Sequence, residues 1–347
     1  MEQLMSFPLL IGGGSSRYQI RQSLRFRASN SAFLHRTFGG VGNRKTWTFN
    51  WRGKRGQFGA LQALFSIYDA STDNDAALIQ FNSSDQLTIA AWFTTWRISN
   101  RVFRDPTAWL DICVVMDTTQ ATANDRVRVW VNGEQITSFA TLNNPSLNAD
   151  LGVNRGSRHE IGRDDFDGTR HFDGYMAEVH FIDGQALTPS SFGQTDTTTG
   201  AWVPRRYTGT YGTNGFYLPF NDAASTTTIS QDRSGNGNNW TSGGISVTAG
   251  ATFDQMLDTP TNNYATLNPL WVHPQIALSN ANLRAVGSSG GAWVSSVGTF
   301  FLSSGKWYWE HTVDTLVSRD GFLFGVAPST VPLNGYIGSS AAAWAVS

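Results

Sequence analysis

One stretch of the chain, Phe172–Gly193, restricts its fold more than any other. Within it Tyr175, Ala177, Val179 and Phe181 alternate with residues that would point the opposite way along an extended backbone. Such a period of two is the sequence signature of a β-strand. One Asp-Gly pair precedes the strand and another follows it, and this pair is typical of tight turns. The opposite face of the predicted strand carries Met176, Glu178, His180 and Ile182.

The composition favours the same kind of structure for the rest of the chain. Only 15% of the 347 residues are charged and 35 are glycines, whereas an average domain is about 25% charged. Of the 26 acidic residues, 21 are Asp and five are Glu. Asp favours turns and caps, and Glu favours helix interiors. We therefore expect an all-β protein of short strands and tight turns.

Further strands are predicted between residues 21 and 193. In the clearest of them, 109–116, every second residue from Leu110 to Met116 is apolar. The alternating run 126–131 leads into Asn132-Gly133, and an Asn-Gly pair between two such runs is a strong hairpin signal. Several strands at this spacing, with no helical segment between them, favour a sandwich of two sheets. The other strands are predicted at 24–27, 46–51, 61–68, 78–81, 87–96 and 134–139.

Motifs at both ends of this region resemble a known family. Ile161-Gly162-Arg163 precedes an F-x-G-x-x-x-E-V run that starts at Phe172, and a V-x-V-N-G hairpin lies upstream of both. The opening segments SLRFR and TWTFNWRGKRG are similar to the first strands of the same fold. The region resembles the laminin-G-like, concanavalin A-like lectin/glucanase jelly rolls, in the form found in tail and fibre proteins of bacterial viruses. The resemblance implies that residues 21–193 form a two-sheet jelly roll.

The segments on either side of this domain differ in character. Residues 1–20 form an arm in which Phe7, Leu9, Leu10 and Ile11 precede a glycine-rich hinge, as expected of a segment that docks onto a partner. The alternative is a disordered terminus. We interpret residues 194–260 as a β-rich connector. Residues 261–347 contain GKWYWE and GFLFGVA runs that resemble strands of the SPRY domain, so a second, incomplete β-sandwich is expected there.

The sequence predicts no catalytic residues. Glucanases of this fold use an E-x-D-x-x-E strand, whose two glutamates act as acid and nucleophile. Here no second Glu lies near Glu178, and we interpret Glu178 as a strand residue that pairs with an Arg across the strand. The chain also lacks a phosphate-binding loop, a nucleophile elbow and zinc-ligand spacing. We expect a protein that is not an enzyme and that needs no cofactor, with calcium as the one candidate.

The calcium candidate is a turn rich in carboxylates. Asp164, Asp165 and Asp167 could supply oxygen ligands, because jelly rolls of the family often hold calcium in loops at the sandwich edge. The alternative, which we favour, is a solvated turn in which Arg170 balances the charge.

Exposed aromatic rings would be needed to stack on the faces of sugars. Trp92, Trp96 and Trp130 are the candidates on the predicted strands. The alternative is that these rings pack in the second sheet or in a contact between subunits.

Charge and arginine content bear on the partners. The net charge of −1 gives no basic field for nucleic acid. Of the 25 basic residues 22 are Arg, which with 13 Trp favours contacts between chains, and we expect a homo-oligomer, with a trimer favoured. The alternative is compositional bias. The sequence has no apolar run of 18 residues, so we expect no membrane insertion.

The start of the chain and its cysteine bear on localisation. The first residues lack the basic region of a secretory signal. Cys113 lies alone in an apolar run, as expected of a core residue of a protein made in a reducing cytoplasm. With the family resemblance, these observations predict a virion protein made in the host cytoplasm, a tail fibre or particle-surface component. Its predicted partners are other virion proteins and a host-surface glycan. The alternatives are a glycan-cleaving enzyme and a cellular lectin or adhesin.

Overall fold

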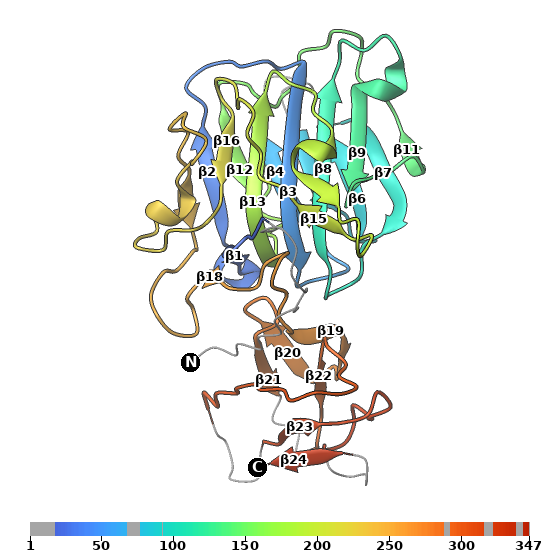
Figure 1. The fold of residues 1–347 in the computed structure, drawn as a ribbon, viewed down its shortest axis with the longest axis vertical. Helices are drawn as coiled ribbons and strands as arrows, with labels where there is room; N and C mark the ends of the chain where they lie inside the picture. The colour runs from blue at the N-terminus through green and yellow to red at the C-terminus, as the bar shows by residue number, and fades with distance from the viewer. Residues whose placement is uncertain are drawn as a thin grey trace.

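Two large antiparallel sheets pack face to face in this computed structural model, which describes residues 18–67, 77–91, 93–287, 292–315, 322–337 and 343–346 (Figure 1). The first sheet contains β1 (Ser23–Phe26), β3 (Thr46–Arg55), β8 (Trp109–Asp117), β9 (Val127–Val131), β10 (Glu134–Gln135), β13 (Gly174–Asp183), β16 (Phe216–Leu218) and β18 (Gln255–Met256). Its order is β10-β9-β8-β3-β13-β1-β18, and β16 also pairs with β13. The second sheet contains β2 (Phe33–Thr37), β4 (Gln62–Ile67), β5 (Ala77–Phe81), β6 (Gln86–Ala90), β7 (Thr95–Val102), β11 (Phe139–Leu142), β12 (Arg158–Ile161) and β17 (Thr241–Gly243). Its order is β11-β7-β6-β5-β4-β12-β2-β17.

Apolar side chains from the facing sides of the two sheets form the main core. The alternating residues of β8 from Leu110 to Met116 all lie in it, as the sequence predicted. Phe49 of β3 stacks on Phe65 of β4 with 4.8 Å between ring centroids, so aromatic contacts join the two sheets directly. The predicted Asn132-Gly133 hairpin is confirmed, because β9 pairs with β10 through this turn. The prediction of an all-β jelly-roll sandwich is therefore confirmed.

A β-bulge in the middle of β13 changes which side chains face the core. The pairing of β13 with β3 shifts register between Ala177 and His180, and Glu178 lies there with a positive φ of 51°. The extra residue of a bulge reverses the alternation of side chains beyond it. Tyr175 therefore lies outside the main core, whereas Val179 lies in it. The single period predicted along this strand was wrong across the bulge.

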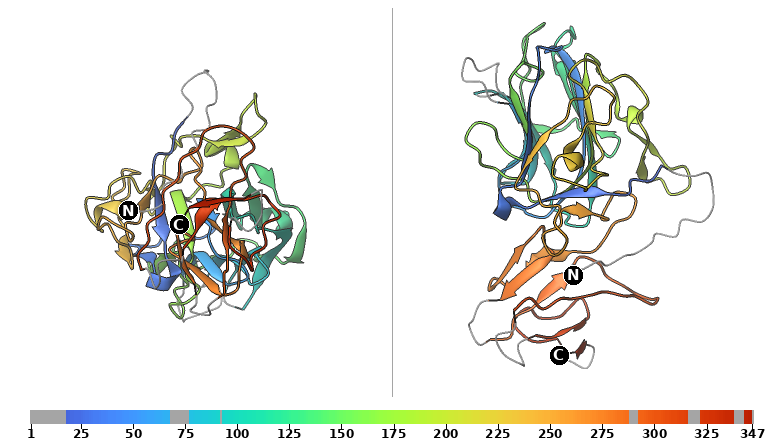
Figure 2. Two further views of the ribbon diagram at one scale, coloured as in Figure 1. Left: turned by 90° about the horizontal axis from the view of Figure 1, so that it is seen from below. Right: turned by 90° about the vertical axis from the view of Figure 1, so that its left-hand side faces the viewer.

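The segment predicted as a connector contributes to both sheets. β16, β17 and β18 all come from residues 194–260 and pair with β13, β2 and β1. Residues 184–215, called here the covering segment, lie over the outer face of the first sheet and include η4 (Pro189–Ser191) and the hairpin of β14 (Gly193–Thr195) and β15 (Trp202–Pro204) (Figures 1 and 2). This face consequently has a second layer of chain packed on it.

The C-terminal region lies beyond one end of the sandwich (Figure 1). Its described residues pair in two-stranded ribbons, and the GKWYWE run at 305–310 forms no strand there, because no neighbouring strand pairs with it. The resemblance of this region to the SPRY domain therefore remains a prediction. The strands are β19 (Leu267–Val272), β20 (Ile276–Ser279), β21 (Arg284–Gly287), β22 (Ser296–Gly298), β23 (Phe324–Val326) and β24 (Trp344–Val346).

Helical structure is limited to single turns in the described residues. Besides η4, these are η1 (Ala28–Asn30), η3 (Ala123–Arg126) and η5 (Thr228–Ser230). Over the same residues, no helix has the length and apolar character needed to cross a membrane.

Candidate functional site

The tryptophans predicted to bind sugar do not form an exposed platform. Trp96 is 3% exposed and lies in the main core, and Trp130 is 8% exposed, with the Arg128 guanidinium 5.5 Å from the centre of its ring. The predicted strand 87–96 is interrupted, because β6 ends at Ala90, β7 starts at Thr95, and the Ala91 amide donates to the Thr94 carbonyl between them. Trp96 and Trp130 therefore cannot offer an open ring face, and Trp92 lies outside the described residues, as do Phe7, Leu9, Leu10 and Ile11.

The predicted calcium turn is held by hydrogen bonds and ion pairs of the protein itself. Asp164 forms an ion pair with Arg170 at 3.1 Å, as the alternative interpretation expected. Asp167 Oδ1 accepts hydrogen bonds from the backbone and hydroxyl of Thr169. Nowhere in the described residues do three or more His, Cys, Asp or Glu side chains group as metal ligands. The turn therefore does not present Asp164, Asp165 and Asp167 as a set of ligands.

A buried network of charges lies on the outer face of the first sheet, under the covering segment. Arg52 of β3 is 1% exposed and donates to Glu178 Oε2 at 2.7 Å and to Asp111 Oδ2 at 3.1 Å. Its third donor group bonds to the carbonyl of Phe192 in the covering segment. The predicted pairing of Glu178 with a cross-strand Arg is confirmed. Arg52 thus joins two carboxylates that lie 67 positions apart in the sequence.

The covering segment is fixed to this network. Trp202 of β15 donates from Nε1 to Asp111 Oδ2 at 3.0 Å, and its ring packs on Gly133. A Cβ on Gly133 would lie 2.3 Å from that ring, and the residue has a φ of +79°. Both observations require glycine in this turn. The Asn132-Gly133 hairpin predicted from the sequence thus also contacts the covering segment through Trp202.

Four tyrosines gather above Glu178 and remain half-buried: Tyr18, Tyr207, Tyr211 and Tyr217, called here the tyrosine surface. The hydroxyls of Tyr18 and Tyr217 both donate to Glu178 Oε1 and lie 3.3 Å apart. Tyr211 lies 6.4 Å from Tyr217, with its ring nearly parallel, and 5.1 Å from Tyr207. Tyr207, Tyr211 and Tyr217 therefore form one continuous aromatic group, to which the hydroxyl of Tyr18 is joined.

His180 lies beneath these rings. It stacks on Tyr217 with 4.5 Å between centroids, and its Nδ1 lies 3.0 Å from the Tyr211 hydroxyl. Burial, with a smaller contribution from Arg52, holds the pKa of His180 well below its ordinary value, so the ring is neutral. Its Nε2 has no hydrogen-bond partner among the described residues.

The tyrosine hydroxyls remain protonated at neutral pH. Burial and the negative charge of Glu178 raise the pKa of Tyr18, and burial raises the pKa of Tyr211 and of Tyr217. Half-buried aromatic rings with polar tips suit ligands that have both apolar faces and hydroxyl groups. Only a weak local signal pointed to this surface, the Tyr/Gly/Thr-rich composition of residues 207–215.

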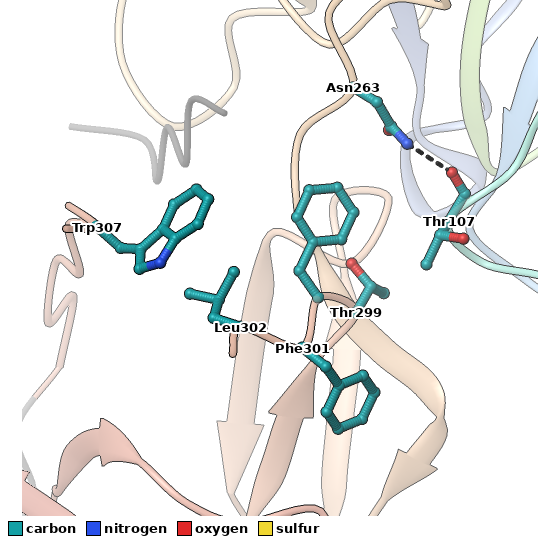
Figure 3. Close-up of a pocket in the computed structure, with 7 residues that line it drawn as sticks. Thr107, Asn263, Thr299, Phe301, Leu302 and Trp307 are labelled. Carbon is teal, nitrogen blue, oxygen red and sulfur yellow. Dashed lines mark hydrogen bonds between the residues drawn. The ribbon is translucent and has the colours of Figure 1, made fainter. Parts of the chain in front are cut away.

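A second candidate is an open hollow of about 370 Å³ between the sandwich and the C-terminal region (Figure 3). Trp307 and Phe301, which are 41% and 61% exposed, contribute rings to its wall. The side-chain amide of Asn263, which also lines the hollow, is already engaged: it donates to the Thr107 carbonyl and accepts from Lys54. The Thr299 hydroxyl likewise accepts from a backbone amide. The hollow thus offers rings, while its Asn263 and Thr299 side chains already have hydrogen-bond partners.

Comparison with known proteins gives a class for the sandwich. Residues 39–191 match the family described as the concanavalin A-like lectin/glucanases superfamily, in its laminin-G form. Residues 39–191, which form most of the sandwich, are therefore similar to this superfamily. No curated protein matches the chain.

Several solved structures have a low similarity to parts of this chain. One is the native heptameric SAP-like pentraxin from Limulus polyphemus, with 16% identity over 49% of this chain and 80% of that chain and a TM-score of 0.35. Another is domain 4 of AbnA, a GH43 extracellular arabinanase from Geobacillus stearothermophilus, with 17% identity over 54% and 84% and a TM-score of 0.36. The mouse laminin α1 domains LG4-5 have 13% identity over 59% and 52% and a TM-score of 0.34. Structural similarities this weak do not indicate a function.

Proposed function

We propose that the protein is a non-enzymatic structural protein of a bacterial virus particle that recognises a host-surface glycan through the tyrosine surface. The single observation that carries the glycan part is the group of four half-buried tyrosines on the outer face of a lectin-like jelly roll. Sugars present C–H faces that pack on aromatic rings and hydroxyls that bond to polar tips. The tyrosine surface offers both.

The state of the nearby carboxylates supports recognition without cleavage. Glycoside hydrolysis needs two carboxyl groups that reach the scissile bond. Glu178 is 3% exposed, and both Glu178 and Asp111 are hydrogen-bonded to Arg52. In this arrangement the carboxylates hold the covering segment and the tyrosines in place.

The particle role rests on the resemblance to tail and fibre proteins and on the N-terminal arm. The protein would sit in a tail fibre or on the particle surface, attached through residues 1–20, as a homo-oligomer with a trimer favoured. Mass spectrometry of purified particles would identify the polypeptide among the virion proteins. Its absence from particles would favour a cellular lectin or adhesin.

Glycan binding is tested by incubating the purified protein with cell-surface polysaccharide fractions. The proposal expects retention of a saccharide by the protein and recovery of that saccharide at its original length. Release of shorter products would favour a glycan-cleaving enzyme. No retention of any fraction would overturn the recognition role.

A further inference from the structure

An exposed cation borders the tyrosine surface. The Arg206 guanidinium lies over the ring of Tyr18, with 5.6 Å between its Cζ atom and the ring centroid. Tyr18 in turn shares Glu178 with Tyr217. Arg206 itself is exposed to solvent. A cation is therefore part of the same surface as the rings.

The negative charges nearby are not directed at Arg206. Glu178 is buried and accepts from Arg52, Tyr18 and Tyr217. No ion pair joins Arg206 to a carboxylate within the described part of the chain. An arginine held against an aromatic ring has its planar fork pre-oriented, which lowers the entropy lost when it binds an oxyanion.

We propose that the tyrosine surface selects an acidic saccharide, in which Arg206 binds a carboxylate or phosphate group while the tyrosine rings contact the sugar. This proposal rests on the proposed function, because it names the ligand class of the same surface. Tyr18 links Arg206 to the other tyrosines, since its ring lies under the Arg206 guanidinium and its hydroxyl donates a hydrogen bond to Glu178. A neutral saccharide would use the rings but leave Arg206 without a ligand group.

A glycan array that carries saccharides with and without acid groups tests the ligand class. Each acidic saccharide is also printed after chemical reduction of its carboxylates to alcohols, and each phosphate-bearing one after phosphatase treatment. We expect binding to acidic saccharides and a loss of binding in whichever treated form lacks its acid group. Binding to neutral saccharides alone would overturn this inference and leave the proposed function standing. Binding to none would overturn both.

Variants of Arg206 test the site. Arg206→Ala and Arg206→Gln are expected to raise the Kd for the bound acidic saccharide at least tenfold, and Gln retains part of the side-chain stem while it removes the guanidinium that lies over Tyr18. The matched control is Arg101→Ala, which removes an exposed arginine on β7 of the opposite sheet and is expected to leave the Kd within twofold. Thermal unfolding checks that all three variants fold. A Kd unchanged in both Arg206 variants would overturn the assignment of the acid group to Arg206.

Discussion

Replacing Arg52 by Met gives the sharpest test of the network beneath the tyrosine surface. Arg52 contributes hydrogen bonds to two carboxylates and to the Phe192 carbonyl, all in a buried setting. Met keeps an unbranched stem that ends near the position of Arg Nε and carries no charge, so the substitution removes these bonds and retains the packing of the stem. Glu178 and Asp111 then lose their shared cation while they remain buried.

The expected loss of stability is large. Removing one partner of a buried ion pair costs about 3–5 kcal/mol, because the remaining charge is left uncompensated. Arg52 serves two carboxylates, so we expect a loss in the upper half of that range, about 4–5 kcal/mol. A domain's whole stability is about 5–15 kcal/mol. The expected loss is therefore a large share of the stability of a domain.

Urea unfolding, followed by tryptophan fluorescence, measures this loss. Adding Glu178→Gln to the Met variant removes one of the two uncompensated charges, so the double variant should regain about 1–3 kcal/mol of the unfolding free energy. Arg52→Lys keeps the charge but not the planar fork, and its unfolding free energy should fall between those of the wild type and the Met variant. A Met variant within 1 kcal/mol of the wild type would refute the view that Arg52 holds this face together.

Three further predictions concern pH, the core and the arm. Burial lowers the pKa of His159 to about 3, below its unfolded value of about 6.5. As the pH falls, the unfolded chain therefore binds the proton first, and up to about 5 kcal/mol of stability should be lost between pH 6.5 and 3. In His159→Gln the free energy of unfolding should depend less on pH over this range. A pH profile identical to that of the wild type would contradict this role of His159. Trp96→Ala should lower the free energy of unfolding, measured by chemical denaturation, by about 3–5 kcal/mol. The control Phe93→Ala, at a residue that is 82% exposed, should lower it by less than about 0.5 kcal/mol. Equal losses would place Trp96 outside the core. Deletion of residues 1–16 should leave a folded protein by circular dichroism that no longer joins particles, and normal incorporation would refute the docking role of the arm.

The sequence predicted the sandwich because one-sided burial is a local pattern. The β8 residues from Leu110 to Met116 and the Asn132-Gly133 turn carry their own signal, and each lies where the pattern placed it. The orientation of Trp96 and the faces of β13 were not predictable in this way. A turn in one case and a bulge in the other interrupt the period of two, and neither leaves a clear trace in the residue pattern.

The candidate site was less predictable than the fold because its residues are far apart in the chain. Tyr18 and Tyr217 meet at Glu178 only when β16 pairs with β13 and Tyr18, about 160 positions earlier in the chain, lies against the same carboxylate. Among the described residues, Arg52 is the side chain that bonds to both Asp111 and Glu178. No local spacing encodes such long-range contacts. The Tyr-rich composition of residues 207–215 was the one local signal, and it gave no partner or ligand.

Hydrogen–deuterium exchange, with and without the saccharide that the protein retains, tests most directly whether the tyrosine surface binds the ligand. We expect slower exchange of backbone amides in residues 205–217 when the saccharide is present, because ligand contact suppresses local opening of the covering segment. Slower exchange confined to residues 299–307, at the hollow in Figure 3, with residues 205–217 unchanged, would contradict it.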